Sequence, residues 1–267
     1  MAGSIPLGVA ALLTLLPAAL LPSRFGARGH SGLFWLLIGV ATVGPLALEI
    51  AARGGVWRTG FSATLWTIVG ATMLVYALIC LVSQPARGLR VFLLPYLVAL
   101  AVIALLWSSV PGAPLPASAM TAWLQVHIGV SVATYALITI SAAAAAAVWL
   151  KERALRRHAV PDWIDAVPSV AEGERLQHRL LLAAEVVLGV GLLTGVATGV
   201  VVGADGVALD HKTILSVAAF AVIGILLLLQ RGSGLRGRHA ARFVLIAYLL
   251  ITLAFPGVKF VTDVLLT

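Results

Sequence analysis

The sequence predicts an all-α membrane protein: a polytopic membrane helical bundle of eight transmembrane helices with both termini outside. Three observations support this prediction: 61% of the 267 residues are hydrophobic, only 10% are charged, and the mean hydropathy is +1.07. Soluble domains contain about 45–50% apolar and about 25% charged residues. The apolar residues also gather in runs near the roughly 20 residues that a helix needs to cross a bilayer.

Eight apolar runs give the predicted helices of a single membrane domain over residues 1–267. They lie near residues 4–22, 32–52, 62–83, 91–110, 120–150, 178–202, 211–230 and 240–264. The fifth run is longer than a bilayer requires, so we expect it to continue beyond the membrane. Residues 151–178 contain Pro161, Pro168 and mixed charges. They are predicted to form a cytoplasmic stalk and an interfacial segment between helices five and six.

The basic residues set the predicted orientation, because loops on the inner side of a membrane are enriched in Lys and Arg. Arg24 and Arg28 follow the first apolar run instead of preceding it, the reverse of a cleavable signal peptide. We therefore expect the first run to be retained as a helix that starts outside. In this orientation the outer side holds few of the 18 basic residues, namely Arg53, Arg58, Lys212 and Lys259.

Composition argues against several classes of protein. The net charge of +8 is scattered over short loops, whereas nucleic-acid binding needs basic residues gathered on one wet face. The single cysteine, Cys80, excludes an internal disulfide and a haem-attaching CxxCH motif. The chain shows no nucleophile–base pair, phosphate loop or metal-hydrolase signature, so we predict that it is not an enzyme.

The fifth helix carries a stripe of polar and aromatic side chains inside the membrane, where such residues are costly. Its members are four residues apart and lie on one helix face: Trp123, His127, Ser131, Tyr135 and Thr139. One interpretation is a ligand-binding face, and the other is hydrogen bonding between helices. The alanines that follow, residues 142–147, predict close packing against a neighbouring helix.

A second candidate site is the start of helix seven, Asp210-His211-Lys212-Thr213. Asp210 is predicted to cap this helix through its first-turn amides, but capping does not explain His211. Helices five and seven both run inward, so His127 and His211 are expected at one depth near the outer face. Two imidazoles there could bind one metal centre, or they could be unrelated polar residues.

Other polar residues and glycines in or near the spans each allow two interpretations of their role. Glu49 precedes Arg53 by four residues, which favours an ion pair, while Arg53 and Arg58 could instead hold an anionic group. Glu185 in helix six is predicted to line a polar crevice or to pair with a basic residue such as Arg179. The glycines at 191, 195 and 199 are typical of tight helix packing more than of a ligand site.

Five segments occur in an order that resembles a known superfamily. They are Val126-His127-Ile128-Gly129-Val130-Ser131, Trp149-Leu150-Lys151-Glu152-Arg153, Asp210-His211-Lys212-Thr213, Leu235-Arg236-Gly237-Arg238 and Pro256-Gly257-Val258-Lys259-Phe260. This pattern resembles the cytochrome c assembly proteins, the haem-handling membrane proteins of the CcsA and CcmC type. Within that superfamily it is most similar to YpjD-like inner-membrane proteins, with HemX-like proteins as neighbours.

The resemblance implies a haem site near the outer face. His127 matches the first histidine that flanks the tryptophan-rich outer loop of the larger relatives, and Asp210 matches the aspartate that ends the tryptophan-rich motif. This chain differs from them in having no tryptophan in residues 200–210 and no histidine after Lys259. Gln230 stands near where some relatives have a histidine. His211 is then the expected replacement ligand.

The leading hypothesis is therefore a multi-pass protein of a bacterial inner membrane that binds non-covalent b-type haem for cytochrome c assembly or haem trafficking. His127 and His211 would be the axial ligands, with Trp123 or Tyr135 beside the ring and Arg53, Arg58 or Lys212 at the propionates. Besides the lipid bilayer and haem, its expected partners are other cytochrome c assembly proteins or apocytochrome. No nucleic-acid partner is expected.

Two alternatives stay open at this point. The first is a non-catalytic regulator of haem biosynthesis that acts through the cytoplasmic segment 151–178, as the HemX-like resemblance implies. The second is a permease for haem or another small molecule. The sequence shows no internal repeat of the kind that many transporters contain.

Overall fold

The fold was obtained as a computed structural model that describes residues 4–20, 31–53, 58–110, 112–115, 120–157, 162–201 and 210–266. Its main elements are eight long helices: α1 (Ser4–Leu20), α3 (Ser31–Arg53), α4 (Phe61–Val82), α5 (Arg90–Leu106), α6 (Ala122–Arg156), α7 (Val170–Val201), α8 (His211–Gly232) and α9 (Gly237–Thr252). Within these described ranges, seven spans are long and apolar enough to cross a membrane, and α1, with 17 residues, is a shorter apolar helix beside them. The predicted all-α polytopic bundle is confirmed.

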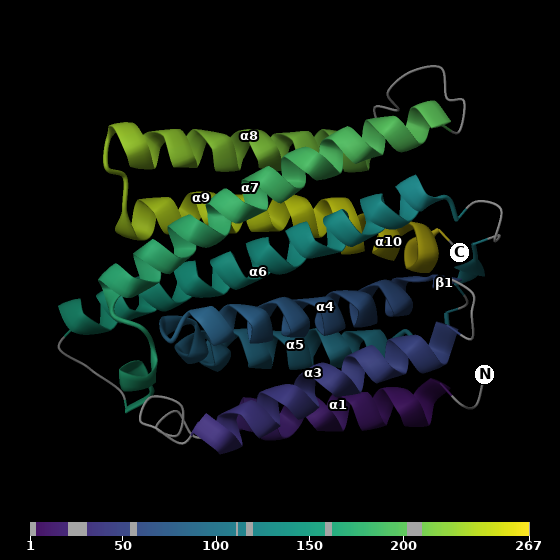
Figure 1. The fold of residues 1–267 in the computed structure, drawn as a ribbon, viewed down its shortest axis with the longest axis horizontal. Coiled ribbons are helices and arrows are strands. Elements are labelled where there is room, and N and C mark those ends of the chain that lie inside the picture. The colour runs from purple at the N-terminus through teal and green to yellow at the C-terminus, as the bar shows by residue number, and fades with distance from the viewer. Residues whose placement is uncertain are drawn as a thin grey trace.

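The helices lie side by side along one long axis and alternate in direction (Figure 1). At one end of the bundle α1, α4, α6 and α8 begin and α3, α5 and α7 finish. The C-terminal segment also ends there, after α9 has continued through the π turn Leu253–Gly257, the short α10 (Val258–Phe260) and a second π turn, Val261–Leu265. We call this the predicted outer end, because the distribution of basic residues in the sequence predicts that both termini lie outside.

Helix α6 joins two packed halves of the bundle. Its residues Ala144 and Ile140 lie in a buried cluster with α1, α3, α4 and α5, whereas Ile138 and Ala145 lie in a second cluster with α7, α8 and α9. Ala144 and Ala145 are fully buried. The alanine run is therefore buried between the two halves, as the sequence predicts, because methyl groups allow neighbouring helices to approach closely.

The segment between the fifth and sixth helices is more helical than predicted. Helix α6 continues to Arg156, a 3₁₀ turn covers Asp162–Ala166, and α7 begins at Val170 instead of near residue 178. A capping box starts α7: the Glu172 carboxylate accepts bonds from the Ser169 backbone and hydroxyl, and the Ser169 hydroxyl accepts one from the Glu172 amide. The Ser-x-x-Glu spacing is the signal that could have located this start.

Two short strands, β1 (Arg58–Thr59) and β2 (Ala113–Pro114), pair antiparallel at the predicted outer end. Next to them Gly60 and Gly112 touch: a Cβ placed on Gly112 would lie 2.7 Å from the Gly60 nitrogen. This contact ties the connection before α4 to the connection before α6. It was not predicted, because two-residue strands have no hydropathy pattern.

Candidate ligand cavity

A cavity of about 720 Å³ lies at the predicted outer end of the bundle. Six parts of the chain form its wall: the start of α4 with β1, Leu115 after β2, the outer half of α6, the outer half of α7, the first turns of α8, and the segment from Ile251 to Lys259. The volume is within the range of small-molecule sites, which is about 300–1,000 Å³. We call this space the ligand cavity.

The ligand cavity is lined by mixed apolar and polar side chains. Its apolar wall includes Ile68, Val132, Leu188, Leu192 and Phe255. Threonine and serine residues from five elements also line it, namely Thr59, Thr64, Thr67, Ser131, Thr134, Thr198, Thr213 and Ser216. A mostly apolar site with a few convergent polar groups suits an amphiphilic organic ligand.

His127 on α6 is the histidine among the described residues that line this cavity. Its ring nitrogen Nδ1 lies 3.1 Å from the Thr194 hydroxyl on α7. That hydroxyl donates its own proton to the Gly191 carbonyl at 3.0 Å, so Nδ1 carries the imidazole proton and donates to Thr194. Nε2 then keeps its lone pair, which is the tautomer that ligates a metal through Nε2.

Glycines on α7 make room for the His127 ring. A Cβ placed on Gly195 would lie 3.1 Å from Cε1 of His127, tighter than an ordinary van der Waals contact. Gly191 and Gly199 line the same cavity. The glycine series thus belongs to the cavity as well as to helix packing, a role that the sequence interpretation missed.

The start of α8 contributes Asp210, Lys212, Thr213 and Ser216 to the ligand cavity. Asp210 caps the helix as predicted, accepting a bond of 2.8 Å from the Thr213 amide. Desolvation raises the pKa of Asp210, but hydrogen bonds from the Thr213 backbone and side chain outweigh it. The pKa is therefore below its usual value.

His211 is exposed and does not line the ligand cavity with His127. The reason is helical geometry, since successive residues on a helix are about 100° apart. The residues at 212, 213 and 216 face the cavity, and position 211 lies on another side of α8. The structure therefore brings Asp210 and Lys212 to the cavity of His127 but does not bring the two imidazoles together there.

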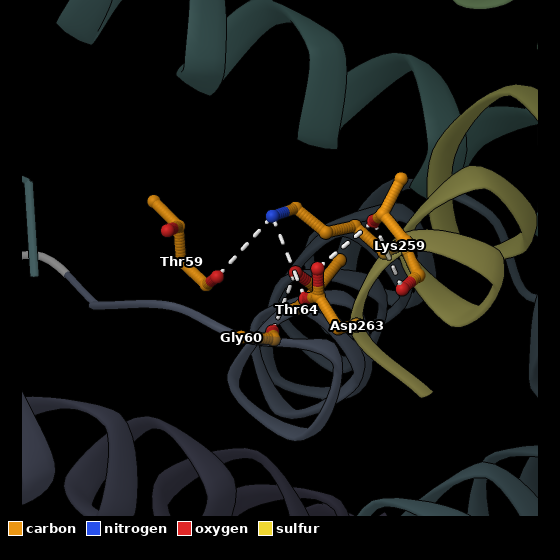
Figure 2. Close-up of polar contacts among 6 residues, drawn as sticks. Thr59, Gly60, Thr64, Lys259 and Asp263 are labelled. Atoms are coloured by element: carbon orange, nitrogen blue, oxygen red, sulfur yellow. Dashed lines mark hydrogen bonds and ion pairs between the residues drawn. The ribbon is translucent and has the colours of Figure 1, made fainter. Parts of the chain in front are cut away.

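Lys259 on α10 also lines the ligand cavity, and the sequence interpretation did not single it out as a site residue. Figure 2 shows its ammonium group reaching Thr59, whose carbonyl oxygen accepts a bond of 3.2 Å, and lying 3.6 Å from the Asp263 carboxylate. Thr59 is 200 positions away in the chain. The signal in the sequence that could have indicated Lys259 is its place in the segment Pro256-Gly257-Val258-Lys259-Phe260, one of the five segments that carry the family resemblance.

Two aromatic candidates lie elsewhere. Trp123 is 50% exposed, and neither it nor Tyr135 lines the ligand cavity. Tyr135 is buried, with its hydroxyl 3.1 Å from that of Tyr96 and 3.4 Å from that of Thr252; Tyr248 bonds to Tyr96. The stripe on α6 is therefore divided, since His127 and Ser131 face the cavity while Tyr135 hydrogen-bonds between helices.

The remaining polar candidates have different outcomes. Glu49 accepts a hydrogen bond of 2.9 Å from the Thr67 hydroxyl on α4. The side chains of Arg53 and Arg58 and residues 202–209 lie outside what the structure describes. His178 is exposed, yet its Nδ1 lies 2.7 Å from Oε1 of Gln230 and so connects α7 to α8 at the other end of the bundle.

Glu185 on α7 lies against α8, with its Oε1 3.0 Å from where a Cβ on Gly224 would be. Its Oε2 is buried without a hydrogen-bond partner among the described residues. Burying such a group costs about 1–3 kcal/mol. We expect Glu185→Met, an apolar side chain of similar length, to raise the free energy of unfolding by about 1 kcal/mol because it removes the unpartnered oxygen, measured by thermal unfolding in detergent. Exposed Asp165→Asn is the control, and a less stable Glu185→Met protein would contradict this interpretation.

The fold and the cavity define a polytopic helical membrane protein with an amphiphilic ligand cavity at one end. The chain belongs to the cytochrome C assembly protein family, whose profile it matches over residues 29–266. It is 44% identical over 275 residues to an uncharacterized 28.8 kDa protein in the nifR3-like 5′ region of Azospirillum brasilense, with all of both chains covered. No solved structure matches it.

Proposed function

We propose that the protein binds haem non-covalently in the ligand cavity, with His127 as an axial ligand, and serves cytochrome c assembly or haem trafficking. The observation that carries this proposal is the His127 ring itself. It lies at the wall of a cavity of about 720 Å³ and is oriented by Thr194 so that Nε2 is available. Imidazole is a common axial ligand of haem iron.

The donor set of the cavity fits haem. The iron of haem already has four ligands from the macrocycle, so a single protein imidazole suffices to hold it axially. The apolar wall, which includes Leu192 and Phe255, suits the macrocycle. Lys212 and Lys259 lie at the outer part of the wall, where their ammonium groups would bind the propionate carboxylates. Bound haem would supply a redox-active iron, or be the cargo that is passed on.

The family assignment supports the same function, because cytochrome c assembly requires the handling of haem. The relative in Azospirillum brasilense is itself uncharacterized. Its similarity extends over the whole chain but indicates no activity. Apocytochrome and other assembly proteins are the partners that this proposal implies.

The test is a titration of the purified protein in detergent with ferric haem, followed by the Soret absorbance. The wild type is expected to give a saturable Soret band, and His127→Ala is expected to lower the affinity at least about tenfold, about 1.4 kcal/mol. Thermal unfolding without haem shows whether the variant is folded. A folded His127→Ala protein that binds haem as the wild type does would contradict the proposal.

The same titration tests the predicted second ligand, His211. Ligation by two imidazoles predicts a low-spin ferric spectrum that becomes high-spin in His211→Ala. The exposed position of His211, away from the cavity wall, instead favours an unchanged spectrum in that variant.

A further inference from the structure

A second cavity lies between α4 and α6. It is a groove of about 520 Å³, lined mostly by apolar residues such as Ala71, Leu74 and Val75 on α4 and Ala133 on α6. We call it the lateral groove. Thr67, Ile128 and Val132 line both the lateral groove and the ligand cavity, so the two spaces adjoin along these three side chains.

The lateral groove opens on the surface of two membrane-spanning helices. Leu74 is 42% exposed and belongs to the span Phe61–Val82, while exposed Gly129 belongs to the span Ala122–Arg156. A Cβ placed on Gly129 would find no atom within 4 Å. Because these helices cross the bilayer, this open space faces lipid rather than water.

We propose that the lateral groove is the passage through which haem moves between the bilayer and the ligand cavity. This inference rests on the proposed function of that cavity. The macrocycle is apolar and partitions into hydrocarbon, whereas its two carboxylates stay at the level of the lipid headgroups. The groove walls are apolar like the interior of the bilayer. The transfer of the ring from lipid into the groove therefore costs little free energy.

The depth of the two spaces supports the same route. Residues 128, 129 and 132 line the groove close to His127 in the chain, in the first three turns of α6, which begins at the predicted outer end. Lys212 and Lys259 line the ligand cavity at that end too. A haem that moves sideways between α4 and α6 therefore keeps its carboxylates in the interfacial layer and meets these ammonium groups as the ring reaches His127.

The test blocks the groove and measures the rate of haem uptake. Protein in phosphatidylcholine vesicles is mixed with ferric haem already dissolved in the same membranes, and growth of the Soret band is followed. We expect Gly129→Trp to slow uptake about tenfold while final occupancy stays at the wild-type level. Gly39→Trp is the matched control, because Gly39 on α3 is exposed and also has no atom within 4 Å of its Cβ position.

A second variant distinguishes a blocked groove from a misfolded protein. The Gly129→Cys protein is folded first and then modified with a bulky methanethiosulfonate reagent, which a reducing agent later removes. The native Cys80 is fully buried, so the reagent reacts at position 129. Uptake should slow on modification and recover on reduction.

The two proposals fail in different ways. Wild-type protein that takes up no haem at all would contradict the proposed function. Wild-type protein that takes up haem, together with a modified Gly129→Cys protein that loads at the same rate, would overturn the lateral passage alone.

Discussion

Replacing Gly195 with leucine is expected to lower haem affinity at least about tenfold, which corresponds to about 1.4 kcal/mol. Gly195 lines the ligand cavity, and a Cβ at this position would already lie 3.1 Å from Cε1 of His127. A leucine side chain adds three more carbons in that direction. It must displace the imidazole, occupy part of the cavity, or both. Haem titration followed at the Soret band measures the change.

The control for this prediction is Gly39→Leu. Gly39 lies in α3, outside the ligand cavity, and has open space around its Cβ position. It should bind haem as the wild type does, which separates an effect on the site from the general cost of changing a glycine in a membrane helix. Unaltered affinity in a folded Gly195→Leu protein would mean that haem does not occupy the space beside His127.

The second large effect is expected for stability. Gly44 on α3 packs against Thr14 on α1 so closely that a Cβ would lie 2.7 Å from the Thr14 Cβ and 2.0 Å from its hydroxyl oxygen. Because the Thr14 Cβ is fixed to the backbone, Gly44→Val must move the two helices apart. Overpacking of this kind costs about 1–3 kcal/mol. Thermal unfolding in detergent should show the lower stability.

Gly39→Val provides a matched control in the same helix, since nothing lies within 4 Å of its Cβ position. Its effect on stability should be small. Helices α1 and α3 do not line the ligand cavity, so Gly44→Val protein that is still folded should keep wild-type haem affinity. A Gly44→Val protein as stable as Gly39→Val would contradict the close packing of α1 on α3.

Hydropathy was sufficient to predict the helices because the bilayer requires long apolar runs. Helix ends were harder where polar residues extend a helix beyond the apolar run. The early start of α7 at Val170, for example, is marked by a capping box and not by hydropathy. The alternating direction of successive helices then followed, because each helix that crosses the membrane must be followed by one that returns.

The candidate site was predictable only in part. Periodicity on one helix identified His127 and Ser131, and local capping chemistry identified Asp210. His211 shows the limit of this reasoning: its depth can be inferred from the sequence, but the side of α8 that it occupies depends on how the helix is rotated against its neighbours. Two residues that are adjacent in a helical sequence point in directions about 100° apart around the helix axis.

Contacts between distant parts of the chain were not predictable from periodicity. Lys259 meets Thr59, and Tyr135 meets Tyr96 and Thr252, only because the helices fold together. The lateral groove likewise depends on the angle between α4 and α6. Such features have no local signal, since each requires side chains from separate helices to converge.

Chemical rescue of His127→Gly by free imidazole tests the central claim most directly. Removing the side chain leaves a space at the cavity wall that imidazole can fill, and imidazole ligates haem iron as histidine does. The account predicts that His127→Gly loses the wild-type Soret band and that added imidazole restores it. Wild-type haem binding by His127→Gly in the absence of imidazole would contradict the account.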